Sequence, residues 1–211
     1  MIRRLLLLGF LASAIPASAD SFSVAIDTSL ISGMTGSLFI SYGPGISPFD
    51  PATATVAGFT GGTLGLVLLP GGAGVLPANL ALDNSAPVLY QQAFTYGSQT
   101  RFTLSFTGPA ISSPNPGAVG GTDFALFLLD GSDAPLLTDD PNGSIFDASI
   151  EAGTGQVSFA TFTNDSNPSV VTVTSTPEPG SLLLLFSGLA GLGLQSQRGR
   201  KDVVSKSVRR A

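Results

Sequence analysis

Hydrophobic and polar side chains alternate in short runs between residues 20 and 176, as they do in half-buried β-strands. In residues 101–106, for example, polar side chains separate Phe102, Leu104 and Phe106, so one face is apolar. About ten such runs recur at the spacing typical of β-sandwiches. They span residues 21–26, 37–42, 53–60, 64–69, 88–96, 101–106, 122–129, 145–150, 156–162 and 169–174.

Glycine and proline mark the breaks between these runs. The glycine pair at 61–62 predicts a hairpin turn, and the Gly-Ser pair at 97–98 predicts a second break. Residues 108–121 are rich in proline and glycine, which predicts an irregular loop. Residues 122–129 are almost all apolar, as in a central strand buried on both faces. No segment before Gly180 has a helical period, so we expect an all-β fold: a single antiparallel β-sandwich of jelly-roll-like type.

The amino terminus has the three parts of a secretory signal peptide. Two arginines precede an apolar stretch over residues 5–14, which is too short to span a bilayer permanently. Ala17 and Ala19 supply the small side chains of a cleavage site. We predict a signal peptide over residues 1–19, removed by signal peptidase so that the mature chain begins at Asp20. The alternative is a retained anchor.

The carboxy terminus places a proline-bracketed glutamate, an apolar segment and a basic cluster in that order. The apolar segment, residues 180–195, would be about 24 Å long as a helix, shorter than a hydrocarbon core of about 30 Å. We predict a single, marginal transmembrane helix there. The bracketed glutamate is the sequence Pro177, Glu178, Pro179, and the basic cluster is Arg198, Arg200 and Lys201.

Basic residues beside a membrane span stay in the cytoplasm. The basic cluster therefore orients the predicted helix, with residues 20–176 outside the cytoplasm and residues 202–211 as a basic cytoplasmic tail. We thus divide the chain into the signal peptide, a β-sandwich domain over residues 20–176, a tail segment over residues 177–201 and the cytoplasmic end.

This three-part tail resembles the PEP-CTERM sorting signal of exported bacterial proteins. In that family the tripeptide is recognised by exosortase, a membrane-embedded cysteine transpeptidase. The resemblance implies a protein that crosses the inner membrane, is anchored transiently, and is then processed and left at the cell surface or outside the cell. Bacteria with this system typically make exopolysaccharide, so a matrix or biofilm role is implied. Signals of the family usually stop soon after the basic cluster, whereas this chain continues through residues 202–211.

The domain itself is similar to one family of small all-β PEP-CTERM proteins without an established activity. The shared features are the segments 27–29, 94–98, 124–130 and 135–138. The resemblance implies the fold and no activity.

The charge of residues 20–176 excludes several classes of function. Twelve acidic residues and a single basic one, Arg101, give this segment a net charge of −11, because the other basic residues lie in the two ends. Such a domain cannot neutralise phosphates, which argues against nucleic-acid binding. The chain has no cysteine and no histidine, which excludes disulfides, thiol catalysis, histidine-based triads and most transition-metal sites.

Four aspartates form a candidate calcium site. Asp130 and Asp133 lie on one turn and Asp139 and Asp140 on the next. Carboxylate oxygens on flexible loops are what Ca²⁺ requires, although no EF-hand pattern is present. The alternative is turn chemistry without metal, which the Asp-Gly and Asn-Gly pairs in these segments favour.

Two further candidates concern sugars. Glycoside hydrolysis needs two carboxylates roughly 5–9 Å apart, and Asp147 with Glu151 could pair along one strand. Tyr42, Tyr90 and Tyr96 are the candidates for stacking on a sugar, or else tyrosines with the hydroxyl at the sheet rim. Glu151 is the only glutamate of the domain and the chain has no tryptophan, so we expect no enzyme.

The lone arginine is expected to pair with a carboxylate across strands. The leading hypothesis is then an exported, non-catalytic structural or interaction protein of the surface or exopolysaccharide matrix. It would need no cofactor, and its partners would be signal peptidase, exosortase, the membrane and possible matrix polysaccharide. The alternative is a calcium- or glycan-binding β-sandwich module.

Overall fold

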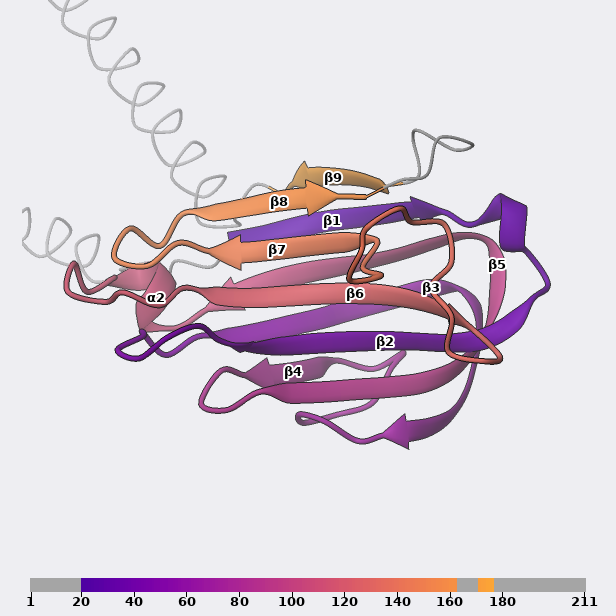
Figure 1. The fold of residues 1–211 in the computed structure, drawn as a ribbon, viewed down its shortest axis with the longest axis horizontal. Helices are drawn as coiled ribbons and strands as arrows, with labels where there is room; N and C mark the ends of the chain where they lie inside the picture. Colours follow the sequence, from indigo (N-terminus) through magenta and orange to yellow (C-terminus); the bar gives the residue numbers. More distant parts are fainter. Residues whose placement is uncertain (1–19, 163–170, 177–211) are drawn as a thin grey trace, which may run out of the picture. The chain divides into compact units, whose positions relative to one another are not determined.

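The computed structural model describes residues 20–162 and 171–176, and these form a nine-stranded antiparallel sheet (Figure 1). All of them belong to one unit of the chain, Ala17–Thr176. The all-β expectation is therefore confirmed. The strands are β1 (Asp20–Asp27), β2 (Thr35–Pro44), β3 (Thr53–Leu69), β4 (Leu80–Asp83), β5 (Val88–Thr107), β6 (Thr122–Asp130), β7 (Phe146–Ile150), β8 (Val157–Thr161) and β9 (Val171–Ser175).

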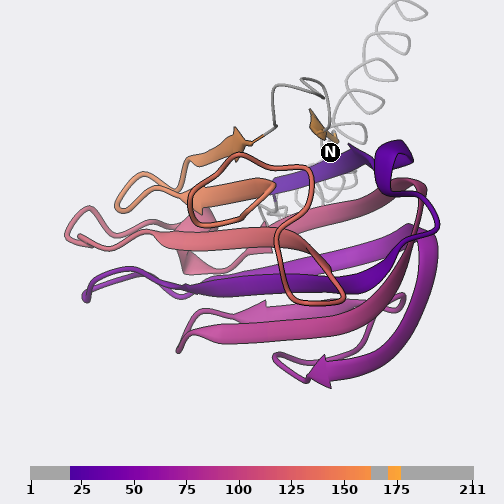
Figure 2. The same ribbon diagram turned by 45° about the vertical axis from the view of Figure 1, so that its right-hand side comes forward.

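The sheet folds into two layers because its two longest strands bend. β3 and β5 pair with each other on both sides of the bend. The first half of β5 pairs with β2, and the second half pairs with β1. We call the strands β9, β1, the second half of β5, the first half of β3, and β4 the β1 layer. The β2 layer contains the second half of β3, the first half of β5, and β2, β6, β7 and β8. Both long strands turn over at the same end (Figures 1 and 2).

Glycines form this corner. Gly61 has a φ of +104°, which side chains rarely adopt. A Cβ at Gly61 would overlap the Gln99 carbonyl, and a Cβ at Gly97 would lie 2.5 Å from the Gly61 oxygen. The predicted hairpin at residues 61–62 and the predicted break at 97–98 are therefore wrong. Glycine inside a strand also marks a bend where two backbones approach closely, and here both strands continue through it.

The core lies between the two layers and is made by alternate residues of each strand. Phe59 and Phe94 meet across the corner with ring centroids 5.5 Å apart. The ring centroids of Phe22 of β1 and Phe159 of β8 lie 4.6 Å apart. The two layers therefore also touch at the side that lies away from β3 and β5. The largest fully buried side chains include Tyr42, Tyr90, Tyr96, Phe106, Phe124 and Phe146.

Strand β6 explains the apolar run at residues 122–129. It lies between β2 and β7, and Phe124 and Leu126 point into the core. On its outer side Phe127 packs against Phe39 of β2. The segment after β6 runs back along it, with Leu136 N donating to the Leu128 carbonyl. The sequence predicts that both faces of this strand are buried. This is true only of the second half of β6, because Asp123 in the first half is exposed.

Three local elements differ from expectation. The segment predicted to be an irregular loop begins with a helical turn, α2 (Pro109–Ser112), and a 3₁₀ turn, η2 (Ser29–Ile31), follows β1. Strand β4 lies in a stretch for which the sequence pattern predicted no strand. The predicted signal peptide and transmembrane helix fall outside the described residues. Within the described ranges, no helix is long and apolar enough to cross a membrane.

Candidate functional site

The folded sheet continues to the residue before the predicted sorting tripeptide. Ser175, the last residue of β9, pairs with Phe22 of β1. Thr176 then donates twice to the carbonyl oxygen of Ser21, from its backbone N and from its Oγ1, each at 2.8 Å. Asp20, the predicted mature amino terminus, is the first residue of the same β1 strand.

Several predicted site residues lie outside the described residues. They are the cleavage-site residues Ala17 and Ala19, the tripeptide Pro177, Glu178 and Pro179, and the basic cluster Arg198, Arg200 and Lys201. These predictions therefore rest on the sequence and on the comparison reported below.

The first pair of candidate calcium ligands is occupied by its own chain. Asp130 Oδ1 accepts hydrogen bonds from the backbone N of Ser132, at 2.7 Å, and of Ala134, at 2.9 Å. Asp133 Oδ1 accepts one from Gln91 Nε2 at 3.0 Å. Asp130 thus has the geometry of a side chain that closes a turn, as the alternative interpretation expected.

In the second pair of candidate calcium ligands, one carboxylate is also occupied by hydrogen bonds from its own chain. Asp140 Oδ2 accepts hydrogen bonds from Ser144 N at 3.1 Å and Ser144 Oγ at 2.8 Å. Burial raises the pKa of Asp140, but these bonds and one from the Asn142 backbone outweigh it and lower that pKa overall. Asp139 is exposed. In the described part of the chain, no group of three or more acidic residues is placed to hold a metal ion.

Asp147, one of the two candidate carboxylates for glycoside hydrolysis, is partly buried. Asp147 Oδ1 is buried and has no hydrogen-bond partner within the described residues. Burial raises the pKa of Asp147, the nearby polar Ser144 side chain opposes this, and the charges of Asp140 and Asp123 add to the rise. A raised carboxyl pKa is a feature of some catalytic acids, but structural networks produce it as well.

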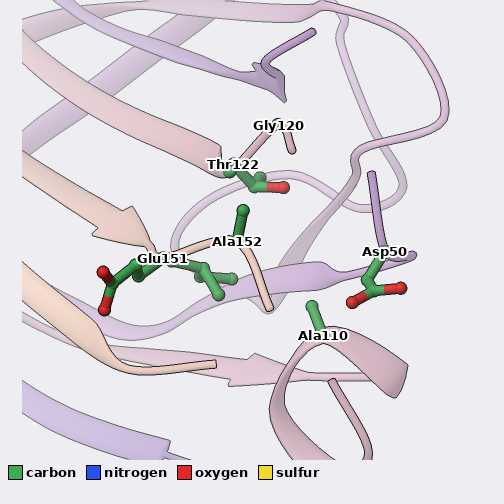
Figure 3. Close-up of a pocket in the computed structure, with 8 residues that line it drawn as sticks. Asp50, Ala110, Gly120, Thr122, Glu151 and Ala152 are labelled. Carbon is green, nitrogen blue, oxygen red and sulfur yellow. The ribbon is translucent and has the colours of Figure 1, made fainter. Parts of the chain in front are cut away.

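Asp147 and Glu151 do not form the expected pair on one strand. Strand β7 ends at Ile150, and Glu151 lies in the following loop, where its Oε2 accepts a hydrogen bond from Thr154 Oγ1 at 2.8 Å. Glu151 instead borders a small cavity with Asp50 (Figure 3).

This cavity cannot hold a sugar. Its volume is about 10 Å³, close to the least that holds one water molecule. In Figure 3 the carboxylate of Glu151 points away from Asp50, and Asp50 Oδ2 already accepts a hydrogen bond from Asn115 N at 2.7 Å. The lining residues are Asp50, Ala110, Gly120, Gly121, Thr122, Ile150, Glu151 and Ala152.

The three tyrosines cannot stack on a sugar, because all of them are buried in the core. Tyr96 Oη lies 2.8 Å from the carbonyl oxygens of both Ser37 and Leu129, which share its single proton. Tyr90 Oη bonds Gln92, whereas Tyr42 Oη has no partner in the described residues. The interpretation of these residues as a sugar platform is therefore wrong. The pattern predicts a strand position for each tyrosine but does not show which face of the strand lies inside.

Among the described residues, the predicted cross-strand ion pair of Arg101 is not found. Its Nε donates to Gln99 Oε1 at 2.8 Å on the same strand. No carboxylate within residues 20–162 or 171–176 forms an ion pair with it. Its cross-strand neighbours are Ala25 and Thr60, which carry no charge.

The outer face of the β1 layer carries aligned hydroxyl groups. Ser23 lies between Thr174 and Thr103 as their cross-strand partner. The residues between these positions, such as Val24 and Leu104, point into the core and are fully buried. The outward hydroxyl residues, which we call the hydroxyl face, are Ser21, Ser23, Thr53, Thr55, Thr103, Ser105, Thr107, Thr172 and Thr174.

Sequence alternation indicates that these residues point outward, but it does not show that they align. Alignment requires the strand order and the register. These place Ser21 beside Ser105 and Ser105 beside Thr55, from three strands that are distant in the chain.

Comparison with known proteins identifies the tail. A family model described as the PEP-CTERM protein-sorting motif matches residues 175–199. No curated protein and no solved structure matches the chain. The motif implies export, membrane-associated sorting toward the cell surface, and exosortase as the processing partner. The chain therefore carries a PEP-CTERM sorting motif, attached to an all-β domain.

Proposed function

We propose that this chain is a non-catalytic protein of the cell surface or extracellular matrix that associates with exopolysaccharide through its hydroxyl face. The sorting motif supports delivery to that location, and the hydroxyl face is the observation that carries the proposed role. Signal peptidase would release Asp20, the apolar segment at 180–195 would hold the chain in the membrane, and exosortase would act at the tripeptide.

The hydroxyl face suits a neutral, extended polymer. Neighbouring strands lie about 4.8 Å apart, and alternate residues along a strand lie about 7 Å apart, so the hydroxyls form a regular array. Each hydroxyl both donates and accepts hydrogen bonds, as sugar hydroxyls do. A single contact of this kind is weak in water. Many equivalent contacts along one polymer add through effective concentration, so affinity grows with chain length.

Exopolysaccharide binding is tested with polymer isolated from the native host. The mature protein should co-sediment with it. A variant that removes three neighbouring hydroxyls, Ser23→Ala with Thr103→Val and Ser105→Ala, should lose at least half of the bound fraction. The matched control removes outward hydroxyls of the β2 layer, Ser41→Ala with Thr95→Val, and should bind like wild type. Equal binding by all three proteins, or none by wild type, would refute the proposed role of this face.

The sorting role is tested at the tripeptide. Changing Pro177, Glu178 and Pro179 together to alanine should leave export intact but block processing. The altered protein should accumulate at full mature length in the inner membrane, as seen by size and fractionation in the native host. Processing of this variant at the wild-type rate would show that the tail is only an anchor.

Calcium binding by Asp130, Asp133, Asp139 and Asp140 is the second candidate function. Four carboxylates on two turns that follow each other in the sequence favour it, although the chain's own donors occupy several of their oxygens and no three of the described carboxylates lie together. Millimolar Ca²⁺ would then raise the melting temperature by mass action. Mg²⁺ and matched NaCl are the controls, because screening alone stabilises a domain with a net charge of −11. An equal shift with all three salts would refute the calcium site.

A further inference from the structure

Strand β9 contains the beginning of the sorting motif. The motif starts at Ser175, which is still paired with β1. The next residue, Thr176, makes two hydrogen bonds to the Ser21 carbonyl. Pro177 follows directly in the chain, so no spacer separates the folded sheet from the tripeptide.

This arrangement conflicts with binding of the tripeptide in an enzyme cleft. Enzymes and receptors that recognise extended peptides use the free backbone edges of the peptide and pockets for its side chains. At Ser175 and Thr176 one backbone edge already pairs with β1. A cleft that encloses these residues must first displace β1.

We propose that β9 is a latch that must separate from β1 before exosortase can take the tripeptide, so that opening of β9 controls the rate of sorting. This inference rests on the proposed processing of the chain. Release of the five residues of β9 would add up to about 17 Å of extended chain between the domain and the tripeptide. The domain itself would stay folded while the tail is processed.

The packing of β9 suits such a role. Among the described residues it pairs with β1 and with no other strand. Its inward side chains, Val171 and Val173, are only half-buried, and Thr172 and Thr174 are exposed. Strand β1, in contrast, is also held by β5 along all eight residues. Elements with few buried apolar contacts open at a lower free energy than the whole domain, so β9 can separate alone.

A reversible cross-link tests the latch directly, because the chain has no cysteine of its own. The bond from Thr176 N to Ser21 O makes their pair hydrogen-bonded. Hydrogen-bonded and non-hydrogen-bonded pairs alternate along an antiparallel ladder, so Val24 and Val173 form a non-hydrogen-bonded pair with closer side chains. The variant Val24→Cys with Val173→Cys can therefore form a disulfide that locks β9.

A matched control locks a different strand. The bond from Glu151 N to Gln156 O places Ile150 and Val157 in the equivalent position between β7 and β8. The variant Ile150→Cys with Val157→Cys experiences the same oxidant and similar core substitutions but leaves β9 free. Wild type, both double variants and the triple-alanine tail variant are compared in the native host, with disulfide formation followed by non-reducing electrophoresis.

The oxidised β1–β9 variant should stay at full mature length in the membrane, with processing slowed at least ten-fold. Adding a reductant should restore processing, whereas the oxidised β7–β8 control should be processed like wild type. Processing of the oxidised β1–β9 variant at the wild-type rate would overturn the latch and leave the sorting role intact. Failure of wild type to be shortened, or normal shortening of the triple-alanine variant, would overturn the sorting role and the latch with it.

A second measurement needs no cysteine. Thr176→Val removes the hydroxyl bond to Ser21 and keeps the size of the side chain, whereas Thr176→Ser keeps the hydroxyl. Loss of one such bond should speed processing roughly two- to ten-fold in the valine variant. Equal or slower processing of Thr176→Val relative to Thr176→Ser would count against the latch.

Discussion

The β1 layer and the β2 layer share two strands, yet their outer faces differ in chemistry. Even-numbered residues of β5 point inward on both sides of the corner, among them Tyr90 and Leu104. The odd-numbered residues point outward. In the β2 layer they are Leu89, Gln91, Ala93 and Thr95, and in the β1 layer they are Arg101, Thr103, Ser105 and Thr107.

The outer face of the β2 layer is partly used by the fold itself. Phe39 and Phe127 pack together there, and Leu129 is almost fully covered by the segment that follows β6. Within the described residues, no side-chain hydrogen bond or ring contact of this kind involves a hydroxyl group on the hydroxyl face of the β1 layer. The difference shows that inward positions specify this fold, while the outward positions differ in chemistry from one layer to the other.

The largest expected loss of stability comes from a substitution at the corner, where β3 and β5 pass from one layer to the other. Gly97→Val should destabilise the domain by about 3 kcal/mol or more, because its side chain would meet the Gly61 carbonyl of the neighbouring strand. Gly131→Val is the control, since the nearest atom to its new Cβ would be 4.0 Å away. Urea denaturation measures both. A small loss for Gly97→Val would mean that the corner can rearrange and that the two layers are less coupled.

The next largest change in stability is expected at two buried tyrosines in the core beneath the β2 layer. Tyr96→Phe removes a hydroxyl that bonds two buried carbonyls, of Ser37 and Leu129, and should cost about 1–3 kcal/mol. Tyr42→Phe removes a hydroxyl that has no partner in the described residues, so it should be neutral or stabilising. Thermal unfolding compares the two, and equal losses would contradict the assigned hydrogen bonds.

A smaller, pH-dependent change in stability is expected for a substitution of Asp147 in the β2 layer. Its pKa is raised in the folded state, mainly by burial, from an ordinary value of 3.8. Between these two pKa values the folded state binds a proton that the unfolded state has lost, so stability falls as pH rises. Asp147→Asn should therefore raise the melting temperature at pH 7 and leave it nearly unchanged at pH 3. A lower melting temperature at pH 7 would show that the charged carboxylate is needed.

The smallest stability effect is expected on the hydroxyl face. The triple variant at Ser23, Thr103 and Ser105 should change the free energy of unfolding by no more than about 0.5 kcal/mol per site, because outward residues contribute little to the core. The same variant should bind less polymer, which separates binding from folding. A large loss of stability would mean that these hydroxyls support the β1 layer, and the contrast between the faces would then fail.

Much of the strand pattern could be predicted, because alternation is local. The strands that contain Phe102 and Phe124 agree with the predicted runs, since a period of two shows directly which residues share a face. The corner could not be predicted. A glycine between two alternating runs, such as Gly61 or Gly97, is found both in hairpin turns and in bent strands. Only the pairing of these runs with a distant strand shows which of the two structures forms.

Some features of the candidate sites could also be predicted from the sequence, and others could not. The Asp-Gly and Asn-Gly pairs predict the acidic turns, and Asp130 does close a turn. Alternation alone leaves Tyr42, Tyr90 and Tyr96 as candidates for the surface, whereas the fold buries them. The charge balance predicts an ion pair at Arg101, but the register places uncharged neighbours beside it.

The sequence by itself determined the all-β class and the sorting tail, because short-range alternation and a contiguous motif need no tertiary contact to be recognised. The tertiary structure decided the two-layer corner, the hydroxyl face and the pairing of Thr176 with Ser21. Each of these depends on residues far apart in the chain that meet through strand order and register. Register is set by how a whole strand buries its apolar face against its neighbours, and that property belongs to the assembled sheet.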